Sequence, residues 1–187
     1  DLDTSDVDLA LRYSVPCPAT QGGMRLFGEQ LAVVASPWLL KGKPELRTPA
    51  DVAQFTLIEA SDAHHSAHLE WLSWRRWLDI HGVDKLQPER WLYFNYAHQI
   101  AQAALSGQGL ALSRMPLIAD ALAAGDLLEV LPRHRIDTPL AYWLMVGPRS
   151  AQRPEVKAFC TWLAAQAEIT RAAIGDGPDP DTQDHLD

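Results

Sequence analysis

The residues with the most evident capacity for chemistry are three histidines in the segment SDAHHSAH, namely His64, His65 and His68. His64 and His68 are four residues apart, so on a helix they would share one face and could bind zinc, with Asp62 nearby. The segment is also polar and precedes a tryptophan-rich stretch, as a solvated loop entering a helix would. No fourth ligand is present at a suitable spacing. We therefore expect no metal site.

Sequence signatures of catalysis are missing. There is no Gly-x-Ser-x-Gly motif, no His-Glu-x-x-His motif and no lysine-bearing phosphate loop. Gly107-Gln-Gly109 is not a dinucleotide fingerprint, because a third glycine is absent and the glycines follow a helix. Cys17 has no evident base beside it in the sequence. We nominate no catalytic residue and no cofactor, and we expect a protein that is not an enzyme.

A binding site is better supported than a catalytic one. Asn95 and Tyr96 lie where a predicted strand ends and a predicted helix begins. The first turn of a helix has free N–H groups and a partial positive charge, so this position favours anions and hydrogen-bond acceptors. Asn95 could equally be the cap of the helix. The two roles are compatible, since a cap uses only part of the amide's hydrogen-bonding capacity.

These residues belong to an alternating series of strands and helices. Three short apolar segments predict strands: Trp91–Phe94, Leu110–Leu112 and Leu127–Leu131. The helix between the first two ends at Gly107, and the helix between the last two begins near Pro116 and ends at Gly125. Such alternation predicts a mostly parallel sheet covered by helices.

The flanking segments supply further elements. Trp71, Trp74 and Leu78 would share one face of a helix, which predicts two tryptophans packed inward. Pro139–Val146 is apolar on both faces and predicts a buried strand. Pro154–Ala167 predicts an amphipathic helix with Val156, Phe159, Cys160, Leu163 and Ala167 on its apolar face.

Composition limits the classes of protein. The chain has 187 residues, with 47% hydrophobic residues and a formal net charge of −8. This acidity argues against nucleic-acid binding by these residues, because phosphate neutralisation needs clustered Lys and Arg. No apolar run approaches the roughly 18 residues of a membrane span. The two cysteines are far apart and form no framework, which favours a reducing, cytoplasmic setting.

A family resemblance rests on the run FNYAHQIAQAALSGQGLALSRMPLIADALAAGDLLEVLP. It resembles the effector-binding domain of LysR-type transcriptional regulators, in the branch that includes the glycine-cleavage and β-lactamase regulators. The matching pieces are Gln102-Ala103-Ala104, Gly107-Gln-Gly109 and Ala124-Gly125-Asp-Leu127. The ordered set, more than any one piece, carries the resemblance, which extends over residues 1 to 170.

The resemblance implies a two-lobed α/β fold like that of type II periplasmic-binding proteins, with two crossover strands as the hinge. Residues 1–29 and 139–170 would form the first lobe, which is incomplete, and residues 30–138 the second. Residues 171–187 would be a disordered acidic tail.

The function implied is ligand sensing and dimerisation. A small-molecule effector would bind in the cleft between the lobes, contacted by Arg12, Tyr13, Asn95, Tyr96 and Tyr142. The chain would form a dimer or tetramer, and operator DNA would be bound through an N-terminal winged helix-turn-helix that this sequence does not contain. The alternative is a solute-binding component of a transporter, which uses the same fold.

Overall fold

The computed structural model describes residues 6–17, 22–61 and 70–177. The chain divides into two compact units. Unit 1 comprises Asp1–Glu29 and Pro139–Asp187, and unit 2 comprises Gln30–Thr138. Two long strands, β2 (Met24–Ala35) and β7 (Ile136–Val146), contribute residues to both units. The histidines of the SDAHHSAH segment lie outside the described residues.

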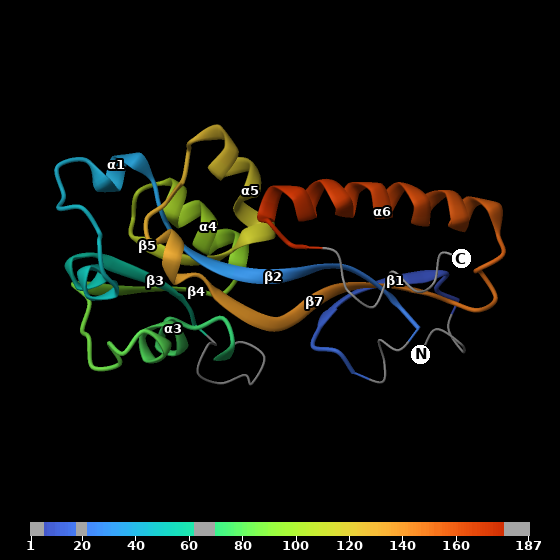
Figure 1. Cartoon of the computed structure of the whole chain (residues 1–187), viewed down its shortest axis with the longest axis horizontal. Coiled ribbons are helices and arrows are strands. Elements are labelled where there is room, and N and C mark those ends of the chain that lie inside the picture. Colours follow the sequence, from blue (N-terminus) through green and yellow to red (C-terminus); the bar gives the residue numbers. More distant parts are fainter. Residues whose placement is uncertain (1–5, 18–21, 62–69, 178–187) are drawn as a thin grey trace. The chain divides into compact units, whose positions relative to one another are not determined.

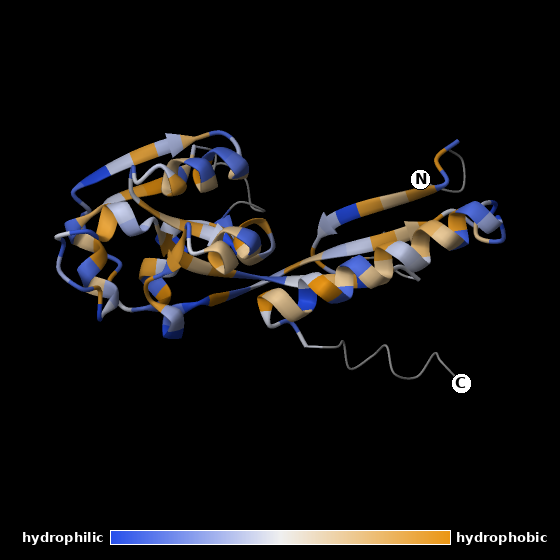
Figure 2. Cartoon of the chain, turned by 90° about the horizontal axis from the view of Figure 1, so that it is seen from above, coloured by the Kyte–Doolittle hydropathy of each residue, from blue (hydrophilic) through white to orange (hydrophobic). Residues whose placement is uncertain are grey.

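Unit 1 is a small antiparallel sheet covered by one long helix (Figure 1). The strand β1 (Leu9–Ser14) pairs antiparallel with β7, from Leu9 opposite Val146 to Ser14 opposite Ala141. The helix α6 (Pro154–Ile174) packs on this sheet through Ala167, which joins Leu26 and Leu144 in a buried cluster. Figure 2 shows hydrophobic and hydrophilic residues mixed along α6, and Cys160 and Leu163 of the predicted apolar face join Ala167 in this cluster.

The end of α6 corrects two expectations. Residues 171–174 are helical, not disordered, and Ile174 is buried. The guanidinium of Arg171 donates to the carbonyl oxygens of Leu26 and Arg25, and Asp176 accepts from the backbone N–H of Gly28 at 2.7 Å. These contacts hold the start of the acidic segment, as far as Asp176, against the start of β2. Phe159, expected on the apolar face, is 41% exposed and lies against Trp162, because it sits at the edge of that face.

Unit 2 has three parallel strands at its centre. The strand β3 (Thr56–Ala60) pairs in parallel with both β4 (Arg90–Phe94) and β5 (Leu110–Arg114). The helices α4 (Ala97–Leu105) and α5 (Met115–Ala124) pack against β3 and β5. The remaining short elements are α1 (Pro37–Leu40), the 3-10 helices η2 (Pro49–Gln54) and η3 (Pro132–His134), α3 (Trp74–Ile80) and β6 (Leu128–Glu129).

The sheet is mixed, so the expectation of a mostly parallel sheet is wrong outside β3, β4 and β5. The strand β2 pairs antiparallel with β5 and with β6, and β1 pairs antiparallel with β7. The described strands pair in the order β1-β7-β2-β5-β3-β4, with β6 beside β2. Local alternation of strands and helices could not reveal this, because β2 and β7 come from outside the alternating segment.

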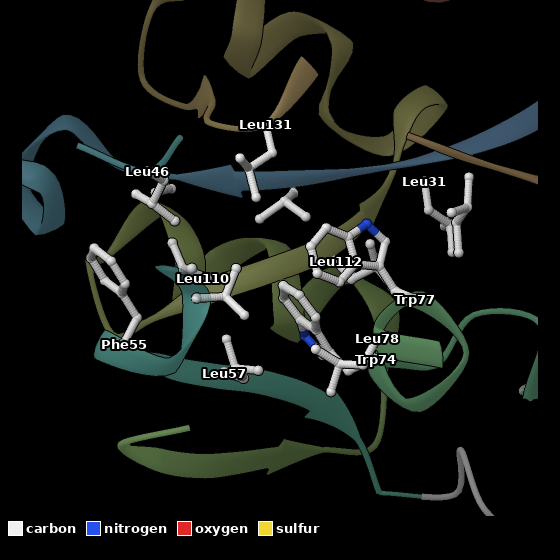
Figure 3. Close-up of a cluster of buried hydrophobic side chains, with 14 residues drawn as sticks. Leu31, Leu46, Phe55, Leu57, Trp74, Trp77, Leu78, Leu110, Leu112 and Leu131 are labelled. Atoms are coloured by element: carbon white, nitrogen blue, oxygen red, sulfur yellow. The ribbon is translucent and has the colours of Figure 1, made fainter. Parts of the chain in front are cut away.

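Two tryptophans form the centre of the unit 2 core (Figure 3). Trp74 and Trp77 are fully buried, with their ring centroids 5.3 Å apart in an edge-on arrangement. Each indole N–H has a backbone acceptor, the carbonyl of Ile58 at 2.8 Å for Trp74 and that of His134 at 2.7 Å for Trp77. Aromatic burial of this kind requires such partners for the N–H groups.

The prediction that Trp71 packs inward is wrong. The helix α3 begins only at Trp74, with the hydroxyl of Ser73 accepting from the N–H of Arg76 as its N-cap. The buried face of this helix therefore comprises residues 74, 77 and 78. Trp71 precedes the helix, is 39% exposed, and stacks with the guanidinium of Arg76 at 4.6 Å.

Two glycines fix the turn between α4 and β5. Gly107 has a φ of +71°, the left-handed conformation predicted for the end of this helix. Gly109 allows β5 to approach β3, because a Cβ at this position would lie 2.5 Å from the carbonyl oxygen of Thr56. The Gly-Gln-Gly sequence thus sets the spacing of two adjacent strands.

Candidate functional site

A pocket lies at the carboxyl ends of the three parallel strands of unit 2. Its volume is about 90 Å³, and it is lined by Ile58, Glu59, Ala60, Leu72, Asn95, Ala97, Ile100, Ala101, Leu112, Ser113, Arg114, Leu117 and Ile118. The carboxyl ends of strands in open α/β sheets are where ligands bind. Pockets for drug-sized ligands measure roughly 300–1,000 Å³, so this one suits a much smaller molecule or part of one.

The elements around the pocket follow directly from the sequence pattern. Two of the strands present their last residues to the pocket: β3 through Ile58, Glu59 and Ala60, and β5 through Leu112, Ser113 and Arg114. Asn95, which follows β4, also lines it. The helices α4 and α5 start immediately after β4 and β5, so their first turns lie at the same edge of the sheet. The lining is mainly apolar with a few polar groups, as in most ligand sites.

Asn95, one of the five candidates from the sequence, lines the pocket but does not cap α4. The N-cap is Tyr96, which has extended dihedral angles and makes no side-chain cap hydrogen bond. The Asn95 side-chain oxygen instead accepts from the hydroxyl of Ser61 at 2.6 Å. This bond joins the residues that follow β3 and β4, and it takes Asn95 away from the first turn of the helix.

Tyr96 is adjacent to the pocket in the sequence but is not part of its lining. Its side chain is 62% exposed and stacks on His98, with the ring centroids 5.6 Å apart. Contact of Tyr96 with an effector stays a prediction.

Glu59 is a pocket residue that was not expected from the sequence. This side chain is 3% exposed, and its carboxylate accepts from the backbone N–H of Trp74 at 3.1 Å. Burial, which penalises the charged form, raises the pKa of Glu59 to about 7, although the N–H groups of Trp74 and Ala60 partly oppose this effect. A carboxyl group inside an otherwise apolar strand, TLIEA, is the sequence signal that could have revealed it.

Ser113 was also missed. It is 5% exposed, and its hydroxyl oxygen is buried with no hydrogen-bond partner among the described residues. Side chains alternate along β5, and Leu110 and Leu112 face the tryptophan core. Ser113 therefore faces the other side of the sheet, where α4 and α5 pack. Buried hydroxyl groups without partners are uncommon in native proteins, so this one needs an explanation.

The other three candidates lie in unit 1. Arg12 is exposed on β1. Tyr13 is paired across the strands with Tyr142 of β7, and their rings are 4.9 Å apart. The hydroxyl of Tyr13 donates to the carboxylate of Glu29, and the ring of Tyr142 also contacts Phe27 at 4.6 Å. The structure thus brings Tyr13 and Tyr142 together, and it places Asn95 and Tyr96 in the other unit.

Two kinds of feature are absent from the part of the chain that the structure describes. No group of three or more His, Cys, Asp or Glu side chains there is arranged to hold a metal ion. Nor does any helix among those residues have the length and apolarity needed to cross a membrane.

Comparison with known proteins agrees with the resemblance seen in the sequence. The chain is 30% identical over 166 residues to the glycine cleavage system transcriptional activator of Escherichia coli, covering 87% of this chain and 50% of that protein. It is 26% identical over 151 residues to the transcriptional regulator TrpI of Pseudomonas aeruginosa, covering 81% and 48%. The chain spans about half the length of these curated relatives.

Solved structures show the same fold. The effector domain of the regulator AmpR of Pseudomonas aeruginosa matches with a TM-score of 0.60 and 24% identity, over 90% of this chain and 78% of that one. The AmpR effector-binding domain of Citrobacter freundii matches with a TM-score of 0.62 and 19% identity, over 90% and 81%. The two-lobed, periplasmic-binding-protein-like α/β fold expected from the sequence is thereby confirmed. The family model described as the LysR substrate binding domain matches residues 1–168, and the chain therefore belongs to this family.

Proposed function

We propose that this chain is the effector-sensing part of a LysR-type transcriptional regulator and that a small molecule binds the strand-end pocket of unit 2. The observation that carries the proposal is the pocket itself, which is lined by the ends of β3 and β5, by the residue that follows β4, and by α4 and α5. Membership of the family supports the regulatory role. The curated relatives named above are transcriptional regulators, so a transporter component is not favoured.

DNA binding belongs to a part of the regulator outside this chain. The chain spans about half of its relatives and carries a net charge of −8, which suits a sensing segment better than a phosphate-binding one. We extend the proposal to a homo-oligomer in the cytoplasm that has no catalytic activity. An effector shifts such a protein only through different affinities for its two states, with couplings of about 1–3 kcal/mol. Arg12, Tyr13 and Tyr142 remain candidates for ligand contact in unit 1.

The test blocks the pocket inside the intact regulator. Ala97 lines the pocket at the first position of α4, so Ala97→Phe would fill it. Ala124 is exposed at the far end of α5, and Ala124→Phe is the matched control. RNA sequencing would compare cells with the wild-type gene, each variant gene and a deletion, with the protein level checked by immunoblotting.

We expect Ala97→Phe to change transcription of the genes that the deletion affects, while Ala124→Phe behaves as the wild type. If Ala97→Phe left every one of those transcripts at the wild-type level under all growth conditions tried, the pocket would not be the sensing site. If deletion of the gene altered no transcripts, the proposed regulatory role would be wrong.

A further inference from the structure

Hydrogen-bond donors gather on one side of the strand-end pocket. The first N–H groups of any α-helix have no acceptor within the helix. In α4 no side-chain hydrogen bond from the N-cap residue Tyr96 satisfies them, and Ala97 at the first helical position lines the pocket. The hydroxyl of Ser113, buried and without a partner among the described residues, faces the same side. Both features suit an acceptor that the described residues do not supply.

The apolar walls of the pocket indicate the chemistry of the rest of the ligand. Ile58, Ile100 and Ile118 contribute apolar surface, and each is at least nine-tenths buried. The volume of about 90 Å³ leaves space for a short branched or linear aliphatic group. A larger aromatic ligand would need more space than these walls enclose.

The charges near the pocket also bear on the choice of ligand. Of its described lining residues, Arg114 and Glu59 are the charged ones. Side chains alternate along β3, so Glu59 lies on the same face of the sheet as Leu57, which packs in the tryptophan core. Its carboxylate therefore points toward α3 and accepts from the N–H of Trp74. Burial raises the pKa of Glu59 to about 7, so a slightly acidic solution keeps most of it neutral. An anion on the α4 side therefore meets a helix N-terminus and little repulsion from Glu59.

We propose that the ligand of this pocket is a small aliphatic carboxylate, whose oxygens accept hydrogen bonds from the Ser113 hydroxyl and from the N-terminal N–H groups of α4. This inference rests on the proposed function, since it names the chemical class of the effector that the same pocket would take. The aliphatic body lies against Ile58, Ile100 and Ile118.

Three probes of one shape separate the effect of charge from that of size: isobutyrate, the neutral isobutyramide and the cationic isobutylamine. Each would be titrated into the ¹⁵N-labelled 187-residue chain at about pH 6, where Glu59 is mainly neutral. The readout is the shift of the Ala97, His98 and Ser113 backbone amide signals. We expect isobutyrate to shift all three, and the other two probes to bind more weakly.

Ser113→Ala tests the hydroxyl donor without endangering the fold. It removes a buried polar group that has no partner, so stability should be unchanged or higher. A hydrogen bond to a charged group typically accounts for about a tenfold change in affinity or more, and the dissociation constant of isobutyrate should rise by that factor. Ser106→Ala, at the exposed opposite end of α4, is the control and should bind as the wild type.

The outcomes distinguish this inference from the proposed function. Stronger binding of isobutyramide or isobutylamine at the three amides would retain the pocket as a ligand site and overturn the carboxylate. Unchanged isobutyrate binding in Ser113→Ala would overturn the role of Ser113. If none of the probes moved these signals, the carboxylate would be wrong, and the transcription experiment with Ala97→Phe would decide the proposed function independently.

Discussion

Glu59 should make the stability of this protein depend on pH in a way that one substitution removes. The unfolded chain has an ordinary glutamate pKa of 4.5, and burial raises the folded pKa to about 7. The folded state thus binds the proton more tightly. The associated stability is complete below about pH 4.5, is lost as the pH rises, and is gone above about pH 7.

The size of the effect follows from the same two values. A difference of one pKa unit corresponds to 1.36 kcal/mol, so the rise from 4.5 to about 7 corresponds to about 3 kcal/mol. Glu59→Gln keeps the shape of the side chain and an acceptor for the N–H of Trp74, but it cannot ionise. We expect the variant to be more stable than the wild type by less than about 1 kcal/mol near about pH 5 and by up to about 3 kcal/mol near about pH 8.

Urea denaturation between about pH 5 and pH 8 would measure this difference, with the fluorescence of the buried Trp74 and Trp77 as the signal. Burial also lowers the pKa of His81, which on its own reduces stability as the pH falls, but His81 is present in both proteins and cancels in the comparison. Glu89→Gln, at an exposed position, is the control and should keep the wild-type pH profile. A difference between Glu59→Gln and wild type that did not change with pH would refute the reasoning, as would a loss of stability in the variant near about pH 8.

Two further predictions concern packing. Tyr96 is 62% exposed, so Tyr96→Ala should cost no more than about 1 kcal/mol of unfolding free energy. Ile100→Ala removes a buried side chain of α4 and should cost about 2–5 kcal/mol. Comparable losses in the two variants would show that Tyr96 is part of the core. Gly109→Ala would place a Cβ 2.5 Å from the carbonyl oxygen of Thr56. Because this contact would force β5 away from β3, the substitution should lower the free energy of unfolding by about 1–3 kcal/mol. A thermal melting temperature equal to that of the wild type would contradict this close approach.

The local structure of the chain could be predicted where neighbouring residues determine it. The order of β4, α4, β5 and α5 follows from apolar spacing, and the ends of α4 and α5 follow from Gly107 and Gly125, both of which have positive φ. The same reasoning failed at Asn95, whose oxygen binds Ser61, a residue 34 positions away. A cap and a cross-strand partner use the same side-chain atom, and the sequence does not say which acts.

Tertiary partners explain the other failures. Glu59 and Ser113 were overlooked because each stands in a short apolar strand, where one polar residue is easily assigned to the solvent side. Burial of Glu59 depends on Trp74, 15 residues away, and the face of Ser113 depends on which side of β5 meets the tryptophan core. The direction of β2 relative to β5 likewise depends on pairing between distant segments.

The hydrogen bonds of Arg171 and Asp176 at the end of α6 have a practical consequence for the choice of domain boundaries in protein expression. The family match stops at residue 168, yet Arg171, Ile174 and Asp176 all lie beyond it. A fragment trimmed to the family boundary would lose the guanidinium that holds the carbonyls of Arg25 and Leu26, together with the carboxylate that holds the N–H of Gly28. The start of β2 would then lack two side-chain partners, and the last turns of α6 would be gone. Expression boundaries for this protein belong after residue 176, so that the hydrogen bonds of Arg171 and Asp176 are kept, whatever the extent of the sequence likeness.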